Sequence, residues 1–291
     1  MDLSRGANRA TVEEIVRGAL REDIGPGDIT GLTTVGAEVR GRGAFLAKQE
    51  GTLAGLNVAG ECFRQVDASV VFEASAREGE GFAVGDILAR VSGPARSLLA
   101  SERVALNFLQ RLCGVASLTR AFADAVEGTG AAIVDTRKTT PGLRALEKAA
   151  VVAGGGRNHR FALYDGVLIK DNHIRVAGGI GQAVAQARAG APHTMKIEVE
   201  TATLDEVTET LEAHADIIML DNMDTQTMAE AVEIIGGRAV VEASGGMTLE
   251  RVGEVARTGV DLISVGRLTH SAPAVDISLE LELDPEPRTL A

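Results

Sequence analysis

From residue 130 onward, short runs rich in Val and Ile alternate with longer amphipathic segments. The predicted strands are 132–134, 167–169, 195–199, 217–220, 239–241 and 262–265. The predicted helices between the later strands are 180–189, 204–213, 225–235 and 249–258. Successive strand–helix units of this length form a parallel sheet with its helices outside. Because no break reverses the strand order, the pattern favours a closed α/β barrel over an open doubly wound sheet.

The first part of the chain has a different rhythm. A predicted helix at 11–23 precedes closely spaced strands at 43–48, 70–74 and 86–91, which favour antiparallel pairing. A long apolar-faced helix is expected over 97–127, with Gly114 as a candidate break. The change of rhythm predicts a domain boundary near Gly114.

The charge of the chain is unevenly distributed. The 291 residues carry a net charge of −12, yet residues 137–175 hold eight Lys or Arg and three Asp or Glu, a local balance of +5. A basic island in an acidic chain indicates a small anionic ligand, because fixed cations in a cleft concentrate anions. A solvated basic face is the alternative. Aromatic residues are only 3%, with no Trp, which argues against general nucleic-acid binding.

The sequence predicts a cytoplasmic protein without membrane contact. Cys62 and Cys113 lie far apart without metal-binding spacing, as expected for buried thiols in a reducing compartment. The first residues contain no apolar signal core, and no run approaches the 18 apolar residues that a membrane span needs.

Polar side chains follow the predicted strands of the barrel, where barrel enzymes place their catalytic residues. Glu198 and Glu200 are two apart in one strand and therefore project to the same side. The other residues in or after these strands are Asp135, Arg137, Lys138, Lys170, Asp221, Asn222, Glu242, Ser244 and, a turn later, His270. Six strands that end this way predict one shared active-site mouth.

Two glycine-containing loops follow the last two strands, Ser244-Gly245-Gly246 and Gly266-Arg267. Barrels commonly bind phosphate at this position through backbone N–H groups, so a phosphate site is expected, with simple turns as the alternative. Carboxylates and ammonium groups are mixed at the other strand ends. They can hold ribose hydroxyls, bind Mg²⁺ with a diphosphate or stabilise a developing cation. A structural lattice of ion pairs is the alternative.

Two further positions remain open from the residues alone. His159 is either a core histidine or a site residue, and the adjacent Arg160, which would be costly to bury unpaired, favours the site. The preceding Gly154-Gly155-Gly156 indicates a flexible or close-approach loop. Arg103 has the spacing of an exposed helical residue that pairs with a carboxylate.

Six motifs occur in a fixed order over about residues 10–280. They are Glu102–Asn107 (ERVALN), Asp135–Gly142 (DTRKTTPG), Gly154–Gly156 with Asn158–Arg160 (GGG, NHR), Lys170–His173 (KDNH), Leu220–Asn222 (LDN) and Ser244–Gly246 (SGG). Together they resemble the quinolinate phosphoribosyltransferase family, which carries out the carboxylating nicotinate-nucleotide pyrophosphorylase reaction. The resemblance implies an α/β fold of type II phosphoribosyltransferases. An N-terminal α/β sandwich domain at 1–114, joined by the tail 272–291, precedes an incomplete, open α/β barrel at 115–271.

The resemblance also implies an activity in NAD biosynthesis. Quinolinate and phosphoribosyl pyrophosphate, with Mg²⁺, would give nicotinate mononucleotide, pyrophosphate and carbon dioxide. The expected assembly is a homodimer or a hexamer of dimers, in which Arg103 reaches across the interface to a substrate carboxylate. One departure is Ala162, where many members have Gly, and no chemical consequence is expected.

The resemblance assigns roles to residues of this sequence. The catalytic group comprises Lys138, Lys170, Glu200 and Asp221. The quinolinate carboxylates are expected at Arg103, Arg137, His159, Arg160 and Lys170. Phosphoribosyl pyrophosphate is expected at Lys138, Glu200, Asp221, Ser244, Gly245, Gly246, Gly266 and His270, with Glu200 and Asp221 as the candidate protein ligands of the metal. The alternatives are a paralogous phosphoribosyltransferase that acts on another anionic acid and a Schiff-base aldolase that uses Lys170.

Overall fold

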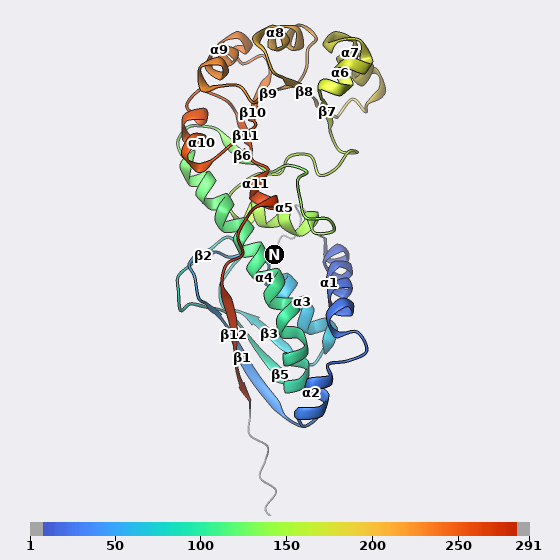
Figure 1. Cartoon of the computed structure of the whole chain (residues 1–291), viewed down its shortest axis with the longest axis vertical. Helices are drawn as coiled ribbons and strands as arrows, with labels where there is room; N and C mark the ends of the chain where they lie inside the picture. The colour runs from blue at the N-terminus through green and yellow to red at the C-terminus, as the bar shows by residue number, and fades with distance from the viewer. Residues whose placement is uncertain (1–7, 284–291) are drawn as a thin grey trace, which may run out of the picture. The chain divides into compact units, whose positions relative to one another are not determined.

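The structure is a computed structural model that describes residues 8–283, and Figure 1 shows the order of its elements. The described chain forms two compact units. The sandwich unit comprises residues 8–120, 139–155 and 269–283, and the barrel unit comprises 121–138 and 156–268. The domain boundary predicted after residue 114 falls inside helix α4 (Ala95–Ala125), and the ends of the predicted first domain lie outside the described residues. That division stays a prediction.

The sandwich unit contains a four-stranded antiparallel sheet in the order β12-β1-β5-β3. Its strands are β1 (Arg40–Ala47), β3 (Val71–Ala74), β5 (Ile87–Pro94) and β12 (Ile277–Leu283). A two-stranded ribbon is formed by β2 (Gly51–Thr52) and β4 (Gly81–Phe82). Because β12 pairs with β1 along its length, the C-terminal segment completes the sheet that the N-terminal part begins.

The helices of this unit are α1 (Arg9–Ile24), α2 (Ile29–Thr34), α3 (Leu56–Val66), part of α4 and α5 (Arg144–Ala153). Helix α3 packs on the sheet through Phe63, whose ring lies 6.0 Å from that of Phe45 and 6.1 Å from that of Phe72. The expected break at Gly114 is wrong, since α4 is continuous there. A Cβ at Gly114 would lie 2.0 Å from the carbonyl oxygen of Pro273, so the glycine serves a close backbone approach.

The barrel unit contains a six-stranded parallel sheet in the order β6-β11-β10-β9-β8-β7. Its strands are β6 (Ala132–Val134), β7 (Val167–Ile169), β8 (Ile197–Thr201), β9 (Ile217–Asp221), β10 (Val240–Ser244) and β11 (Leu262–Ser264). The last strand lies beside the first, as in a barrel, but β6 and β7 do not pair within the described residues. The incomplete barrel is therefore confirmed, and the closed barrel expected from the strand rhythm is wrong.

The opening between β6 and β7 has a local cause. The segment after α5 runs along the free edge of β6, where Arg157 forms a parallel bridge with Val134. The Arg157 N–H donates to the carbonyl oxygen of Ile133 at 2.8 Å, and the Asp135 N–H donates to that of Arg157 at 3.1 Å. This pairing is one residue long, so it occupies the edge of β6 without extending the sheet to β7.

The barrel helices are α6 (Asp171–Ala177), α7 (Ile180–Gly190), α8 (Leu204–Glu212), α9 (Thr225–Ile235), α10 (Leu249–Ala256) and the short α11 (Arg267–His270), which ends in the sandwich unit. Figure 1 shows α7, α8 and α9 on the outer side of the strands. Ile197 and Val199 belong to a buried cluster with Ile180 and Val184 of α7. The opposite face of the sheet is therefore the inner face of the barrel. None of the described helices has the length and apolar character that a membrane crossing requires.

Candidate active site

Four neighbouring strands present polar side chains at their carboxyl ends. The register pairs Glu200 with Met219, Met219 with Glu242 and Asp221 with Ser244. Paired residues of parallel strands share a face, and so do alternate residues of one strand. The inner face therefore carries Lys170, Glu198, Glu200, Asp221, Glu242 and Ser244. Lys170, Glu200, Asp221 and Ser244 are partly exposed at the mouth, whereas Glu198 and Glu242 are buried beneath it.

Lys170 and Glu200 form an ion pair at this mouth. The register places Ile169 beside Val199, so the next residues along β7 and β8 are also neighbours. The Lys170 side chain is 45% exposed and the Glu200 side chain 18% exposed, so the pair is open to solvent and adds little to stability. Its consequence is positional, because the carboxylate holds the ammonium group at the strand ends.

The side chain of Asp221 is held by the next residue. The Asn222 side-chain amide donates to Oδ2 of Asp221 at 2.7 Å, and the Asn222 N–H donates to the carbonyl oxygen of Ser244 at 3.0 Å. Asn222 has a φ of +56°, a left-handed conformation that Asn tolerates better than most residues. The turn after β9 thus orients a carboxylate and joins the end of β10.

The turn after β10 packs directly against Asn222. A Cβ at Gly245 would lie 2.2 Å from Oδ1 of Asn222, and Gly245 has a φ of +91°. Arg251 of α10 donates to the carbonyl oxygen of Met223 at 2.7 Å and to that of Gly245 at 3.2 Å. One guanidinium group therefore joins the two turns, and the glycines leave the backbone open to close approach by a ligand.

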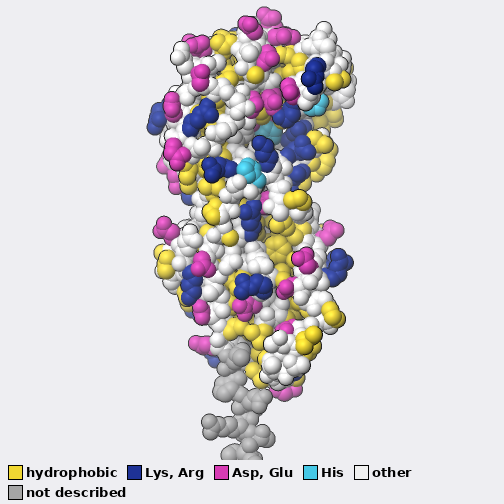
Figure 2. Space-filling view, viewed as in Figure 1, with side chains coloured by type: hydrophobic (Ala, Val, Ile, Leu, Met, Phe, Trp, Pro, Cys, Tyr) yellow, Lys and Arg dark blue, Asp and Glu magenta, His cyan; other side chains and the backbone are white. Residues whose placement is uncertain are grey.

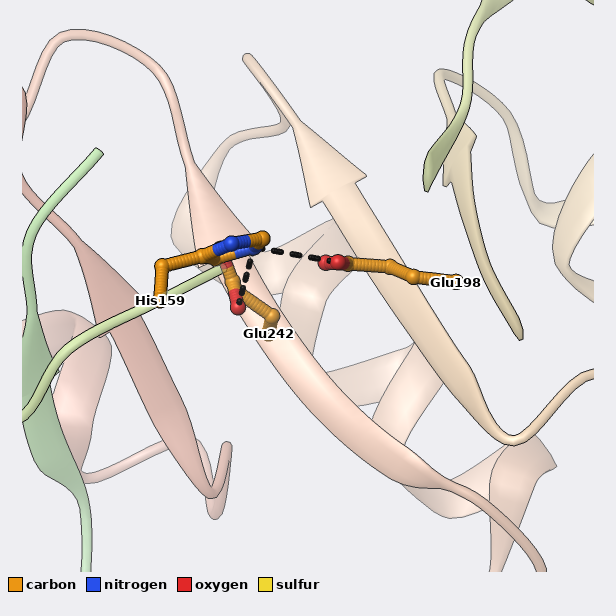
Figure 3. A group of neighbouring side chains, drawn as sticks. All are labelled: His159, Glu198 and Glu242. Atoms are coloured by element: carbon orange, nitrogen blue, oxygen red, sulfur yellow. Dashed lines mark ion pairs between the residues drawn. The ribbon is translucent and has the colours of Figure 1, made fainter. Parts of the chain in front are cut away.

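Beneath the mouth, the ring of His159 meets two buried carboxylates (Figure 3). His159 Nε2 lies 3.0 Å from Oε2 of Glu198 and 3.6 Å from Oε2 of Glu242. The His159 N–H donates to Oδ1 of the buried Asp135 at 2.9 Å, which fixes the backbone at the ring. The bridge between Arg157 and Val134 brings this segment to the inner face.

This cluster shifts the ionisation of one carboxyl group. The pKa of Glu242 is raised from its ordinary value of 4.5 to about 7, first by burial and then by the negative charge of Glu198, with His159 acting in the opposite direction. Burial disfavours a carboxylate because the interior solvates charge poorly. The layer beneath the mouth is therefore a place where a proton is retained near neutral pH.

The same three side chains have a geometry that a metal ion could use, since their ligand atoms lie within 4.8 Å of one another. The second ring nitrogen argues against that use. His159 Nδ1 accepts the Arg160 N–H at 2.7 Å, so Nε2 carries the proton of the neutral ring. A metal-bound His normally donates from its other nitrogen, which this contact prevents. The ring is therefore a donor to the glutamates.

Arg160 and Arg137 lie close enough to repel each other. The pKa of Arg160 is lowered, first by burial and then by the charge of Arg137. Arg160 Nη1 donates to the carbonyl oxygen of Gly166 at 2.9 Å, while its buried Nε has no hydrogen-bond partner among the described residues. Two neighbouring guanidinium groups with donor capacity favour a bound anion, and planar forks match carboxylates. Figure 2 shows Lys, Arg and His side chains gathered on one face of the barrel unit.

Comparison with known proteins identifies the family. Residues 28–113 match the family "Quinolinate phosphoribosyl transferase, N-terminal domain", and residues 115–280 match its C-terminal domain. The chain is a member of the quinolinate phosphoribosyltransferase family.

Relatives in this family cover nearly the whole chain. The "Probable nicotinate-nucleotide pyrophosphorylase [carboxylating]" of Bacillus subtilis is 42% identical over 96% of this chain and 96% of its own length. The chloroplastic enzyme of that name from Oryza sativa is 43% identical over 94% of this chain and 78% of its own. A crystal structure of NadC from Streptococcus pyogenes is 39% identical with a TM-score of 0.93, covering 97% of this chain and all of that one. The predicted family and fold class are thereby confirmed.

The predicted site residues of this family member are distributed over both units. The barrel unit holds Arg137, Lys138, His159, Arg160, Lys170, Glu200, Asp221, Ser244, Gly245, Gly246 and Gly266. Arg103 and His270 belong to the sandwich unit. The barrel residues with contacts described above lie at the inner face, while the role of every predicted residue stays a prediction. The ring of His159 faces Glu198 and Glu242 in the buried part of this face.

Sequence reasoning did not assign roles to Asn222, Glu242 or Arg251. Asn222 is part of the family motif Leu220–Asn222. Its hydrogen bond to Asp221 joins two adjacent residues, so the Asp-Asn sequence itself suggests the contact. Arg251 lies six residues beyond Gly245 on a helix, and its contacts depend on how β9 and β10 align. These contacts depend on tertiary structure, and no local sequence pattern predicts them.

Proposed function

We propose that this chain transfers the phosphoribosyl group of phosphoribosyl pyrophosphate to quinolinate, with decarboxylation, giving nicotinate mononucleotide, pyrophosphate and carbon dioxide in NAD biosynthesis. The observation that carries the proposal is the layered inner face of the barrel. Cationic groups that suit a dicarboxylate and carboxylates that suit a ribose and its metal lie at the mouth of one sheet.

Quinolinate has two adjacent carboxylates, and the proposal places them against Arg137, Arg160 and Lys170. The mutual repulsion of the two guanidinium groups supports this placement, because two negative charges would relieve it. His159 is held by Glu198 and fixes the backbone that leads into Arg160. The ring thus sets the direction from which Arg160 approaches the substrate.

Phosphoribosyl pyrophosphate is placed against Lys138, Glu200, Asp221 and the loops at Ser244–Gly246 and Gly266, with His270 at the 5′-phosphate. Glu200 and Asp221 also fit Mg²⁺, which takes one or two carboxylates together with substrate phosphates. Both carboxylates lie on the inner face at the strand ends, as such a site requires. When bound, the metal would neutralise charge on the pyrophosphate leaving group.

The chemistry follows from these placements. The ring nitrogen of quinolinate attacks the anomeric carbon as the carbon–oxygen bond to pyrophosphate breaks. Glu200 and Asp221 stabilise the positive charge that develops on the ribose. The bond between C2 and its carboxylate then breaks and carbon dioxide leaves. The electron pair stays on C2, where the adjacent cationic ring nitrogen stabilises it, and C2 takes up a proton. The fixed cations orient the acid for both steps.

We further propose that the chain acts in the cytoplasm as a homodimer or a hexamer of dimers. Arg103 would be contributed to the partner's quinolinate site. It is exposed on α4 and forms no hydrogen bond or salt bridge with the rest of residues 8–283, so its guanidinium group is available to a partner. Both cysteines are buried free thiols, which suits a reducing compartment.

The proposal is tested by incubating the purified protein with phosphoribosyl pyrophosphate, Mg²⁺ and either quinolinate or nicotinate. Nicotinate mononucleotide and carbon dioxide are expected from quinolinate, and no product from nicotinate, which lacks the second carboxylate. Product from nicotinate, or from neither acid in a folded sample, would favour a paralogous enzyme for another acid. An adduct on Lys170 after borohydride reduction with a sugar phosphate would favour the aldolase.

A further inference from the structure

A buried ion pair joins two helices of the sandwich unit. Arg111 of α4 donates to Oε1 of Glu147 of α5 from Nη2 at 2.8 Å and from Nε at 3.2 Å. The Glu147 side chain is fully buried, and that of Arg111 is 26% exposed. An ion pair in this setting is often no more stabilising than apolar packing, because both charges lose water. Both side chains of the pair also form hydrogen bonds with connecting segments.

Among the described residues, the other hydrogen bonds of the Glu147 carboxylate come from Thr140. Oε2 accepts the Thr140 N–H at 2.9 Å, and Oε1 accepts the Thr140 hydroxyl at 2.7 Å. Thr140 lies two residues after Lys138, in the segment predicted to carry contacts to phosphoribosyl pyrophosphate. The buried carboxylate therefore fixes both the backbone and the side chain of that segment.

The remaining contacts of Arg111 go to another connecting segment. Nη1 donates to the carbonyl oxygen of Ala272 at 2.8 Å, and Nη2 donates to that of Thr269. These two carbonyls flank His270, the residue predicted at the 5′-phosphate. One guanidinium–carboxylate pair of the sandwich unit thus holds Thr140, two residues after Lys138 in the chain, and the two carbonyl groups on either side of His270.

We propose that Arg111 and Glu147 are positioning residues for phosphoribosyl pyrophosphate. They act through Thr140 on the segment of Lys138 and through Thr269 and Ala272 on that of His270. The inference rests on the proposed site residues. A planar fork can hold the carboxylate and two carbonyl groups at once, which an ammonium group cannot do with the same geometry. Small displacements of binding groups are costly, since a misplacement of about 1 Å can reduce a rate about 100-fold.

The test is Arg111→Lys, with Arg96→Lys as the matched control. Arg96 lies on the same helix and also donates to two carbonyl groups, those of Val35 and Leu32, in a segment without predicted site residues. We expect Arg111→Lys to raise the KM for phosphoribosyl pyrophosphate about tenfold or more and that for quinolinate far less. Arg96→Lys should change both by no more than about twofold. The inference would be overturned if the two variants changed the KM for phosphoribosyl pyrophosphate equally. It would also be overturned if Arg111→Lys raised the KM for both substrates equally.

Thr140→Val keeps the proposal testable if Arg111→Lys does not fold. This substitution removes only the hydroxyl donor and keeps the backbone N–H bond to Glu147. A KM for phosphoribosyl pyrophosphate raised about threefold or more, at a thermal midpoint near that of the parent, is expected. An unchanged KM overturns the inference. His270→Ala tests the proposed site separately from the positioning role. If this variant binds phosphoribosyl pyrophosphate as the parent does, the proposed site itself is wrong.

Discussion

The side-chain amide of Asn222 donates a 2.7 Å hydrogen bond to the carboxylate of Asp221, from a backbone held in the left-handed region. This contact links a strained turn to the orientation of a predicted catalytic group. Backbone strain of this kind persists only where the surroundings hold it in place. Here the N–H of Asn222 is held by Ser244.

Two substitutions of Asn222 distinguish the effect of its left-handed backbone from that of its side-chain amide. Asn222→Gly keeps the left-handed turn at no steric cost but removes the amide that orients Asp221. We expect kcat/KM to fall about tenfold with little change in the thermal midpoint. Asn222→Ala should in addition lower the thermal midpoint, because Ala is strained there. Activity measurements beside melting curves check both; full activity in the Gly variant would contradict the orienting role.

Gly245 cannot accept a side chain without displacing Asn222. Gly245→Ala would place a Cβ 2.2 Å from Oδ1 of Asn222. We expect the affinity for phosphoribosyl pyrophosphate to fall about tenfold or more, measured by calorimetry. The matched control is Gly237→Ala, which also has a positive φ, of +74°, but no atom within 4 Å of the added Cβ. If both variants lose the same affinity for phosphoribosyl pyrophosphate, backbone strain alone explains the loss and the clash with Asn222 does not contribute.

Arg160 is predicted to bind quinolinate and not phosphoribosyl pyrophosphate. Removing its fork should weaken quinolinate binding far more than phosphoribosyl pyrophosphate binding, because its donors suit a carboxylate. We expect Arg160→Ala to raise the quinolinate KM about 100-fold, and Arg160→Lys to restore only part of the affinity. Steady-state kinetics with each substrate varied in turn measures the effect. Equal losses for both substrates would contradict the assignment.

Glu242 predicts a pH dependence of stability with a defined sign. The pKa of this carboxyl is raised from 4.5 to about 7 in the folded protein, so the folded state binds the proton more tightly than the unfolded state. The group therefore favours folding below pH 4.5 and loses that contribution as the pH rises to about 7, by at most about 3 kcal/mol. Glu242→Gln should flatten the fall of the thermal midpoint between pH 5 and 8.

The control for this experiment is Glu250→Gln, which makes the same chemical change on α10. The pKa of Glu250 is lowered, chiefly by the Thr248 side chain, so its titration has the opposite sign. Its variant should leave the parent's fall between pH 5 and 8 in place. A Glu242→Gln variant that follows the parent's curve throughout this range would show that Glu242 titrates near its ordinary pKa.

The sequence predicted the barrel strands well because each is a short apolar run between turns, and period two correctly placed Glu198 and Glu200 on one face. It did not predict α3. The N-cap residue of that helix is Gly55, which has no side chain to cap it. Its first N–H groups are instead bound by Glu78, which accepts from Gly55 at 2.8 Å and from Leu56 at 2.9 Å. A cap supplied from 22 residues away leaves no local signal.

The sequence also did not predict the contacts of His159 with the two buried glutamates. The neighbours of His159 in the sequence favoured a site residue, and the family resemblance implied a substrate ligand. Its partners Glu198 and Glu242 lie in strands β8 and β10. Their meeting depends on the parallel register and on the bridge between Arg157 and Val134. Residue type and spacing therefore predicted the residues at the mouth of the barrel. The buried contacts of His159 with Glu198 and Glu242 could be recognised only in the folded sheet.

The proposed reaction is tested most directly with quinolinate labelled with ¹³C in the carboxylate next to the ring nitrogen. With phosphoribosyl pyrophosphate and Mg²⁺, we expect labelled carbon dioxide, unlabelled nicotinate mononucleotide and pyrophosphate in equal amounts. A phosphoribosylated product that retains both carboxylates, or release of pyrophosphate without labelled carbon dioxide, would contradict it.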